Sequence, residues 1–143
     1  MKLTHHDLSV DLDDEWWCAA QMARFIPATK AYRTSQNLTK SDEPIQEVSI
    51  ADIAPVHRTV GIFRDNEDEG IPVRQRVLKI LCGFRLGEAI PPVEVVECGP
   101  GSLHRFKLTA GTHRLYLSLA AGFSHVPAVK GWVPDYEIGE DPA

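Results

Sequence analysis

The stretch from Arg105 to Val129 constrains the fold most, because it changes from strand to helix within a few residues. Phe106 and Leu108 alternate with polar residues, which predicts a strand. The turn Ala110-Gly111-Thr112-His113-Arg114 follows, and a helix over 112–121 with almost no charge begins within it. A strand that passes through glycine into a helix leaves backbone N–H groups unpaired at the helix start. This turn is therefore the candidate site.

The chemistry of the turn suits an anion. The helix dipole adds partial positive charge to the free N–H groups, and Gly111 allows a close approach of the backbone. Arg114 supplies a guanidinium that matches phosphate oxygens, and Thr112 supplies a hydroxyl that caps the helix or contacts a ligand. His113 titrates near neutrality and is the candidate catalytic residue. The alternative is a capped helix start with an exposed arginine.

The order of motifs around the turn resembles the ParB/sulfiredoxin superfamily. Its members carry Gly-Glu-Arg-Arg or Gly-Cys-His-Arg where this chain has Gly111 to Arg114, or Asp-Gly-His-His-Arg where it has Ala110 to Arg114. The resemblance covers residues 48–130 and includes the segments 48–53, 90–95 and 126–129 and a helix from Val73. It implies that the turn binds the phosphates of a nucleotide (ATP, ADP or CTP), with or without Mg²⁺. It also implies that Arg58, in the loop after the segment 48–53, contributes to phosphate binding.

The positions at which this sequence differs from the family's motifs determine which of the family's activities are possible for this protein. Sulfiredoxins carry their catalytic cysteine where this chain has Thr112, and a hydroxyl cannot replace a thiolate in that chemistry. ADP-dependent serine kinases carry an aspartate where this chain has Ala110, so a kinase would need Asp52, Asp65 or Glu67 as its base or Mg²⁺ ligand. Slow nucleotide hydrolysis and phosphotransfer both stay open. The alternative is a non-catalytic protein-interaction or DNA-associated module with a vestigial pocket.

Composition narrows the class of protein further. A chain of 143 residues with 43% hydrophobic content has the size of a single domain, 1–143, that buries a core. A net charge of -5 and a pI of about 5.6 argue against binding DNA mainly through its phosphates. Cys18, Cys82 and Cys98 are widely spaced, so neither disulfides nor a metal site is expected, and a cytoplasmic location fits best. No apolar run has the length of a membrane span.

The N-terminal part, residues 1–46, is expected to hold one helix and a connector. Asp13 or Asp14 can cap a helix that runs to Phe25. Trp16 and Trp17 on this helix pack against the core, or else they form a surface for a homodimer or a protein partner. His5 and His6 lack a third ligand in range and indicate a frayed terminus.

The core at 48–130 is expected to be an α+β fold, in which helices pack on a small mixed sheet. Strands are predicted at 47–53, 93–97, 103–109 and 126–129, and the second and third of these form a hairpin. A helix is predicted at 73–85, between Pro72 and Gly87. Its basic side chains form a solvated surface, or else they contact a nucleic acid or an acidic partner. Those side chains are Arg74, Arg76, Lys79 and Arg85.

Overall fold

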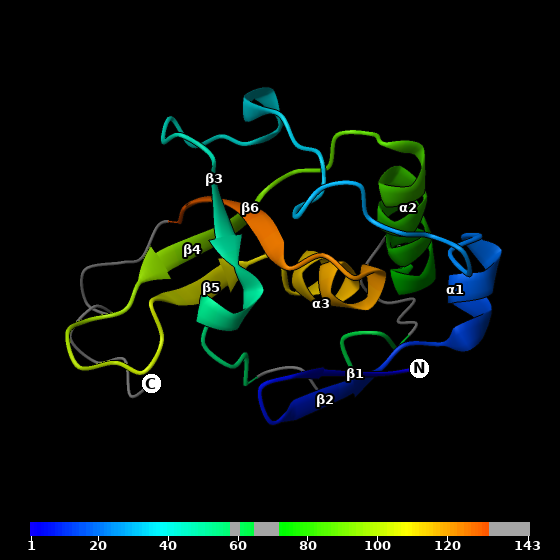
Figure 1. The fold of residues 1–143 in the computed structure, drawn as a ribbon, viewed down its shortest axis with the longest axis horizontal. Helices are drawn as coiled ribbons and strands as arrows, with labels where there is room; N and C mark the ends of the chain where they lie inside the picture. Colours follow the sequence, from blue (N-terminus) through cyan, green and yellow to red (C-terminus); the bar gives the residue numbers. More distant parts are fainter. Residues whose placement is uncertain (58–60, 65–71, 132–143) are drawn as a thin grey trace.

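The computed structural model describes residues 1–57, 61–64 and 72–131 (Figure 1). The strands in these ranges are β1 (Lys2–His5), β2 (Leu8–Asp11), β3 (Gln46–Ser49), β4 (Val93–Glu97), β5 (Phe106–Ala110) and β6 (His125–Lys130). The α-helices are α1 (Asp14–Ala19), α2 (Val73–Leu86) and α3 (Thr112–Ala121). Two short 3-10 helices lie at Gln36–Leu38 and Ile50–Asp52. No helix in the described ranges is long and apolar enough to cross a membrane.

Four of the strands form a mixed sheet in the order β3-β6-β4-β5. β6 pairs antiparallel with β3 and parallel with β4. β4 and β5 form the antiparallel hairpin that the sequence predicts, with a register shift between Glu94 and Val95. The sheet and the three helices together confirm the predicted α+β fold with a small mixed sheet.

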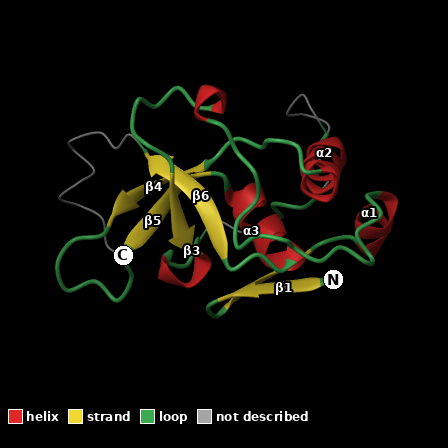
Figure 2. Ribbon diagram, turned by 45° about the horizontal axis from the view of Figure 1, so that its top comes forward, coloured by secondary structure: helices red, strands yellow, loops and turns green. Residues whose placement is uncertain are grey.

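α3 lies at the centre of the molecule, between the sheet and α2 (Figures 1 and 2). It contacts β4 and β6 of the sheet, α2, and the strand β1 of the N-terminal hairpin. Leu115, Tyr116 and Leu117 on this helix have no exposed surface. Neighbours on several sides explain why the sequence of α3 carries almost no charge after its first turn.

α2 confirms the helix that apolar periodicity predicts. Its buried side chains recur every three or four residues and face α1 and α3: Val73, Val77, Ile80, Leu81 and Phe84. The helix continues to Leu86, one residue beyond the predicted end. Gly87 then ends it with a φ of 70°, in the left-handed region where glycine is favoured.

The expectation of a frayed N-terminus is wrong. Residues 2–11 form a two-stranded hairpin, β1–β2, which packs against α3. His5 is only 4% exposed, and its Nε2–H donates to the carbonyl of Ile50 at 2.9 Å. The Nε2–H of His6 donates to the carbonyl of Ile53 at 2.8 Å. Both histidines therefore attach the hairpin to the rest of the chain, because each finds a backbone acceptor that the sequence does not reveal.

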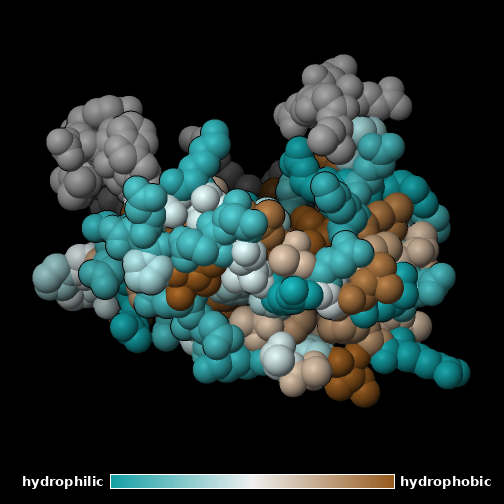
Figure 3. Space-filling view, turned by 90° about the horizontal axis from the view of Figure 1, so that it is seen from above, coloured by the Kyte–Doolittle hydropathy of each residue, from teal (hydrophilic) through white to brown (hydrophobic). Residues whose placement is uncertain are grey.

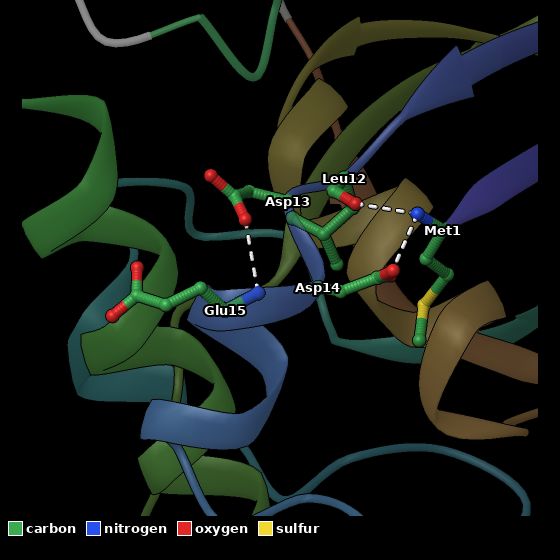
Figure 4. A network of polar contacts seen from close by, with 5 residues as sticks. All are labelled: Met1, Leu12, Asp13, Asp14 and Glu15. Carbon is green, nitrogen blue, oxygen red and sulfur yellow. Dashed lines mark hydrogen bonds and ion pairs between the residues drawn. The ribbon is translucent and has the colours of Figure 1, made fainter.

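α1 is shorter than predicted. The Asp13 side chain caps the helix, as expected, by accepting from the N–H of Glu15 at 2.9 Å (Figure 4). The ammonium group of Met1 lies 2.8 Å from the Asp14 carboxylate and donates to the carbonyl of Leu12, also at 2.8 Å. The helix ends at Ala19 instead of Phe25, and the backbone of Gln21 has a φ of 60°. The chain turns here to pass over α2, so tertiary packing overrides the local helical pattern.

Two strand boundaries also differ from those predicted. The strand expected at 47–53 pairs with β6 only as far as Ser49. A 3-10 turn at Ile50–Asp52 then carries the chain to the opposite edge of the sheet. There Ile53 forms a parallel bridge with Phe106 of β5, and the N–H of Ala54 donates to the Phe106 carbonyl. The strand expected at 103–109 begins only at Phe106, and Leu103 is 95% exposed in the preceding loop.

Candidate functional site

The turn between β5 and α3 consists of a single residue, Gly111. Its φ of 103° lies in the left-handed region, and a Cβ atom there would lie 2.8 Å from Cγ1 of Val93. The N–H of Leu115 makes the first intrahelical bond, to the carbonyl of Gly111. Within the described ranges, the N–H groups of residues 112–114 have no hydrogen-bond partner. Three donors at the positive end of the helix dipole are therefore available to an anion.

A cavity of about 400 Å³ opens at this turn. Three segments line it, namely the loop at Ile62, the α2 residues Arg76 and Ile80, and the turn residues Gly111, Thr112, His113 and Arg114. The fold thus brings all four candidate residues of the turn to one cavity. Its volume lies within the range of small-molecule sites. Arg58, the fifth residue predicted to bind phosphate, lies outside the described residues.

Arg76 is a cavity residue that the sequence analysis did not assign to the site. It is exposed on α2, four residues before the buried Ile80, and its side chain makes no hydrogen bond or ion pair within the described part of the chain. The spacing to Ile80 places Arg76 beside the apolar face of the helix. The spacing from Arg76 to Ile80 can be read from the sequence. Only the packing of α2 against α3 shows which part of the α2 surface borders the turn at Gly111.

His113 is held in one orientation by the loop at residues 61–64. Its Nε2–H donates to the carbonyl of Ile62, and its ring lies 5.4 Å from that of Phe63. Burial lowers the pKa of His113 below its ordinary value, and the positive charges of Arg76 and Arg114 lower it further. His113 is therefore neutral near pH 7. Because Nε2 carries the proton that the carbonyl accepts, Nδ1 is the nitrogen that can take up a further proton.

Arg114 has a structural contact as well as a place at the cavity. Its Nη1 donates to the carbonyls of Pro91 (3.0 Å) and Pro92 (2.6 Å), at the entrance to β4. The hydroxyl of Tyr32 donates to the same Pro91 carbonyl at 2.6 Å. The sequence analysis considered Arg114 only as a phosphate ligand or as an exposed side chain. In the structure, Nη1 of the guanidinium is hydrogen-bonded to the two backbone carbonyls, so Nε and Nη2 remain as donors for a ligand.

Thr112 does not cap α3, in contrast to one of the roles expected for it. Gly111 occupies the cap position, and no side chain supplies a capping bond. Thr112 instead lines the cavity. Its hydroxyl makes no hydrogen bond to any described residue, and the second role expected for it, contact with a ligand, stays open as a prediction.

The carboxylates considered for phosphate transfer are not brought to the cavity by the described structure. Asp52 lies in the 3-10 turn after β3 and does not line the cavity. Asp65 and Glu67 lie outside the described residues. Over residues 1–57, 61–64 and 72–131, no three histidine, cysteine or acidic side chains form a group that could hold a metal ion.

The two tryptophans of α1 have different environments. Trp16 is 6% exposed and belongs to the hydrophobic core, whereas Trp17 is half-buried and packs against it. The packing of this helix on the core is confirmed by its contacts with α2. A homodimer or partner surface on α1 would consequently have to be formed by Trp17 without Trp16.

Comparison with known proteins adds no identity to this geometry. No family model matches the chain. The searches of curated proteins and of solved structures found no match either. Similarity to the ParB/sulfiredoxin superfamily therefore stays a prediction, and a function must be argued from the cavity at the start of α3.

Proposed function

We propose that the cavity at the N-terminus of α3 binds the phosphates of a nucleotide. The observation that carries this proposal is the convergence on one cavity of Gly111, Thr112, His113 and Arg114 with a second arginine, Arg76, from a different helix. Free N–H groups at a helix start and two guanidinium groups favour a polyanion over a neutral ligand. ATP, ADP and CTP are the candidates, with or without Mg²⁺.

The three free N–H groups of residues 112–114 would contact one phosphate at the start of α3. Arg76 has no competing partner in the described chain, so its whole guanidinium is available to a second phosphate. Arg114 would contribute through Nε and Nη2 while Nη1 keeps its bonds to the carbonyls of Pro91 and Pro92. Arg58 belongs to the same proposal as a ligand from the loop.

His113 is the group in the proposed site that could support turnover. It is neutral near pH 7 and has Nδ1 as a proton acceptor, so it can act as a general base toward water or a hydroxyl substrate. In this proposal the bound nucleotide is slowly hydrolysed, or its phosphate is transferred. The chemistry needs a ligand bound first, so binding is the property to test.

The test is a thermal-shift screen of the purified protein with ATP, ADP, CTP, GTP and pyrophosphate, each with and without Mg²⁺. A ligand at about a hundredfold above its dissociation constant stabilises a protein by roughly 2.7 kcal/mol, which gives a clear shift. Arg76→Ala should weaken binding by about 1.5–3 kcal/mol, the contribution of hydrogen bonds to a charged group. Lys79→Ala, which removes an exposed cation from the same helix outside the cavity, is the matched control.

Arg114→Ala should weaken binding as well, but it also removes the bonds to Pro91 and Pro92, so its own stability must be measured first. If none of these ligands shifts the melting temperature of the folded protein, the proposal is wrong. A shift of equal size in the wild type, Arg76→Ala and Arg114→Ala would place binding elsewhere. Including a DNA duplex at several salt concentrations tests the DNA-associated alternative.

A further inference from the structure

A second, larger groove lies at the C-terminal end of α2. It has a volume of about 590 Å³ and runs between the segment that follows α1, residues 21–33, and the C-terminal turn of α2. Its base is aromatic, because Tyr32 stacks on Phe84 at 5.2 Å and Phe123 meets Phe84 edge-on at 5.2 Å. Phe25 extends this aromatic base beside Phe123, at 5.9 Å. None of the residues that line the groove lines the nucleotide cavity.

Two large apolar side chains border the groove and face solvent. Ile26 is 83% exposed and Leu86 is 59% exposed, and each comes from a different wall. In the space-filling view, hydrophobic surface is visible among hydrophilic side chains on the half of the molecule that holds α1 and α2 (Figure 3). Exposed apolar side chains on both sides of an aromatic base are typical of a surface that binds another apolar group.

Three arginines also line this groove. Arg24 and Arg33 come from the segment after α1, and Arg85 comes from α2. Backbone contacts across the groove hold two of them, since Arg33 Nη1 donates to the carbonyl of Gly87 and Arg85 Nε to the carbonyl of Ala20, both at 3.0 Å. Each bond uses one of the five guanidinium N–H groups, so four remain on each side chain. Arg24 has no partner in the described part of the chain.

The charge of the groove is opposite to that of the protein. The chain carries a net charge of -5, yet three arginines and one acidic residue, Glu88, line the groove. Within the described ranges, none of the three arginines forms an ion pair. Unpaired arginines beside exposed apolar side chains leave both electrostatic and apolar binding surface unused.

We propose that this groove binds an acidic segment of a partner protein. A bulky apolar side chain of that segment would lie on the aromatic base between Ile26 and Leu86. Flanking aspartate or glutamate side chains would pair with Arg24 and Arg33 on one wall and with Arg85 on the other. Arginine and aromatic side chains are the residue types that contribute most to protein interfaces.

A peptide segment suits this groove better than a compact anion. The arginines come from two walls with apolar surface between them, so one small carboxylate or phosphate would contact only part of the basic surface. A polypeptide with acidic residues on both sides of an apolar one can contact all of it at once. The site is independent of the proposed nucleotide cavity and does not depend on a nucleotide being bound.

The test uses fluorescein-labelled peptides with a central Phe, Leu, Ile or Trp and three Asp or Glu residues on each side. Binding is followed by fluorescence anisotropy, beside counterparts with Asn and Gln for the acids or Ser for the apolar residue. The double variant Arg24→Glu/Arg33→Glu should bind roughly tenfold more weakly, a loss of one charge-assisted hydrogen bond or more. Ile26→Ser should bind a few-fold more weakly, because it removes part of the apolar contact.

Lys40→Glu/Lys2→Glu is the matched control, because both lysines are exposed outside the groove and the change in net charge is the same. It should keep wild-type affinity, and circular dichroism should show every variant folded. Equal weakening in this control, or equal binding of the uncharged counterparts, overturns the proposal. Complete displacement of the peptide by 3-phenylpropionate would overturn it in favour of a small carboxylate ligand. Self-association abolished by Arg24→Glu/Arg33→Glu would overturn it in favour of a second copy of this chain.

Discussion

Gly111 is the residue on which the geometry of the candidate site most depends. A Cβ at this position would lie 2.8 Å from Cγ1 and 3.1 Å from Cβ of Val93, and the φ of 103° is itself unfavourable for other residues. Gly111→Ala should therefore lower the free energy of unfolding by about 1–3 kcal/mol, measured by urea denaturation. Gly99→Ala, where a Cβ meets no atom within 4 Å, is the control and should change it by less than about 0.5 kcal/mol. Equal effects of the two variants would contradict this account of the turn.

Two buried tyrosines should respond differently when the hydroxyl is removed. The Tyr116 hydroxyl is buried and has no hydrogen-bond partner among the described residues, whereas the Tyr32 hydroxyl donates to Pro91 at 2.6 Å. Tyr116→Phe should leave stability unchanged or raise it by up to about 1 kcal/mol, because a buried polar group without a partner is costly. Tyr32→Phe should lower it by about 1 kcal/mol. A clear loss of stability in Tyr116→Phe, measured by thermal or urea unfolding, would mean that the hydroxyl has a partner such as bound water.

At the scale of elements, α1 depends on its cap because it spans only Asp14–Ala19. A helix this short gains little from its own hydrogen bonds. Asp13→Ala removes the bond to the N–H of Glu15 and should cost about 1 kcal/mol of unfolding free energy, measured by chemical denaturation. Asp7→Ala, at the exposed turn of the hairpin, is the control for loss of one negative charge. Equal effects of Asp13→Ala and Asp7→Ala would show that the loss of a negative charge, and not the loss of the cap, lowers the free energy of unfolding.

The elements with strong periodicity were the ones that the sequence could predict. α2 and α3 were found within a residue or two because apolar spacing and the glycines 87 and 122 mark their extent. The β1–β2 hairpin was missed because histidine is a polar residue and does not indicate a buried strand. The burial of His5 depends on its hydrogen bond to the carbonyl of Ile50, which is distant in the sequence. α1 was extended too far because Met22 and Phe25 suit the apolar face of a helix locally, whereas the backbone turns at Gln21.

The candidate site was predictable only where its residues are neighbours in the sequence. Gly111 to Arg114 are contiguous, so a local pattern could place them together. Arg76 and Ile62 reach the cavity only because α2 and the loop at 61–64 pack beside the start of α3. The two donor bonds of Arg114 to Pro91 and Pro92 cross more than twenty residues of sequence and have no local signature.

At the scale of the whole molecule, positive charge is distributed unevenly. The net charge is -5, but Arg76 and Arg114 line one cavity and Arg24, Arg33 and Arg85 line a separate groove. A negative net charge disfavours nonspecific contact with nucleic acid while leaving local positive sites for small or defined anionic partners. The two sites are the ones for which we propose separate ligands, a phosphate ligand at the cavity and an acidic polypeptide at the groove.

Two histidines, the buried His5 and the half-buried His113, connect the stability of the molecule to pH. Burial lowers the pKa of His5, and the neighbouring His6 and His104 lower it further, with ring centroids 4.3 Å apart for His5 and His6 and 4.6 Å for His6 and His104. The edge of the Tyr116 ring faces His5 from α3, at 6.1 Å. Burial also lowers the pKa of His113, and the charges of Arg76 and Arg114 lower it further. Both imidazoles are therefore neutral near pH 7 in the folded protein.

Because both folded-state pKa values lie below the ordinary 6.5, the unfolded chain binds more protons than the folded chain just below that pH. Stability from these groups is complete above about pH 6.5 and should be lost as pH falls toward the folded-state values. Urea midpoints of the wild type should therefore decrease from about pH 7.5 to about pH 5.5. The variant His5→Gln/His113→Gln should show a smaller decrease, whatever its stability at neutral pH. A decrease as large as that of the wild type would assign the pH dependence to other groups.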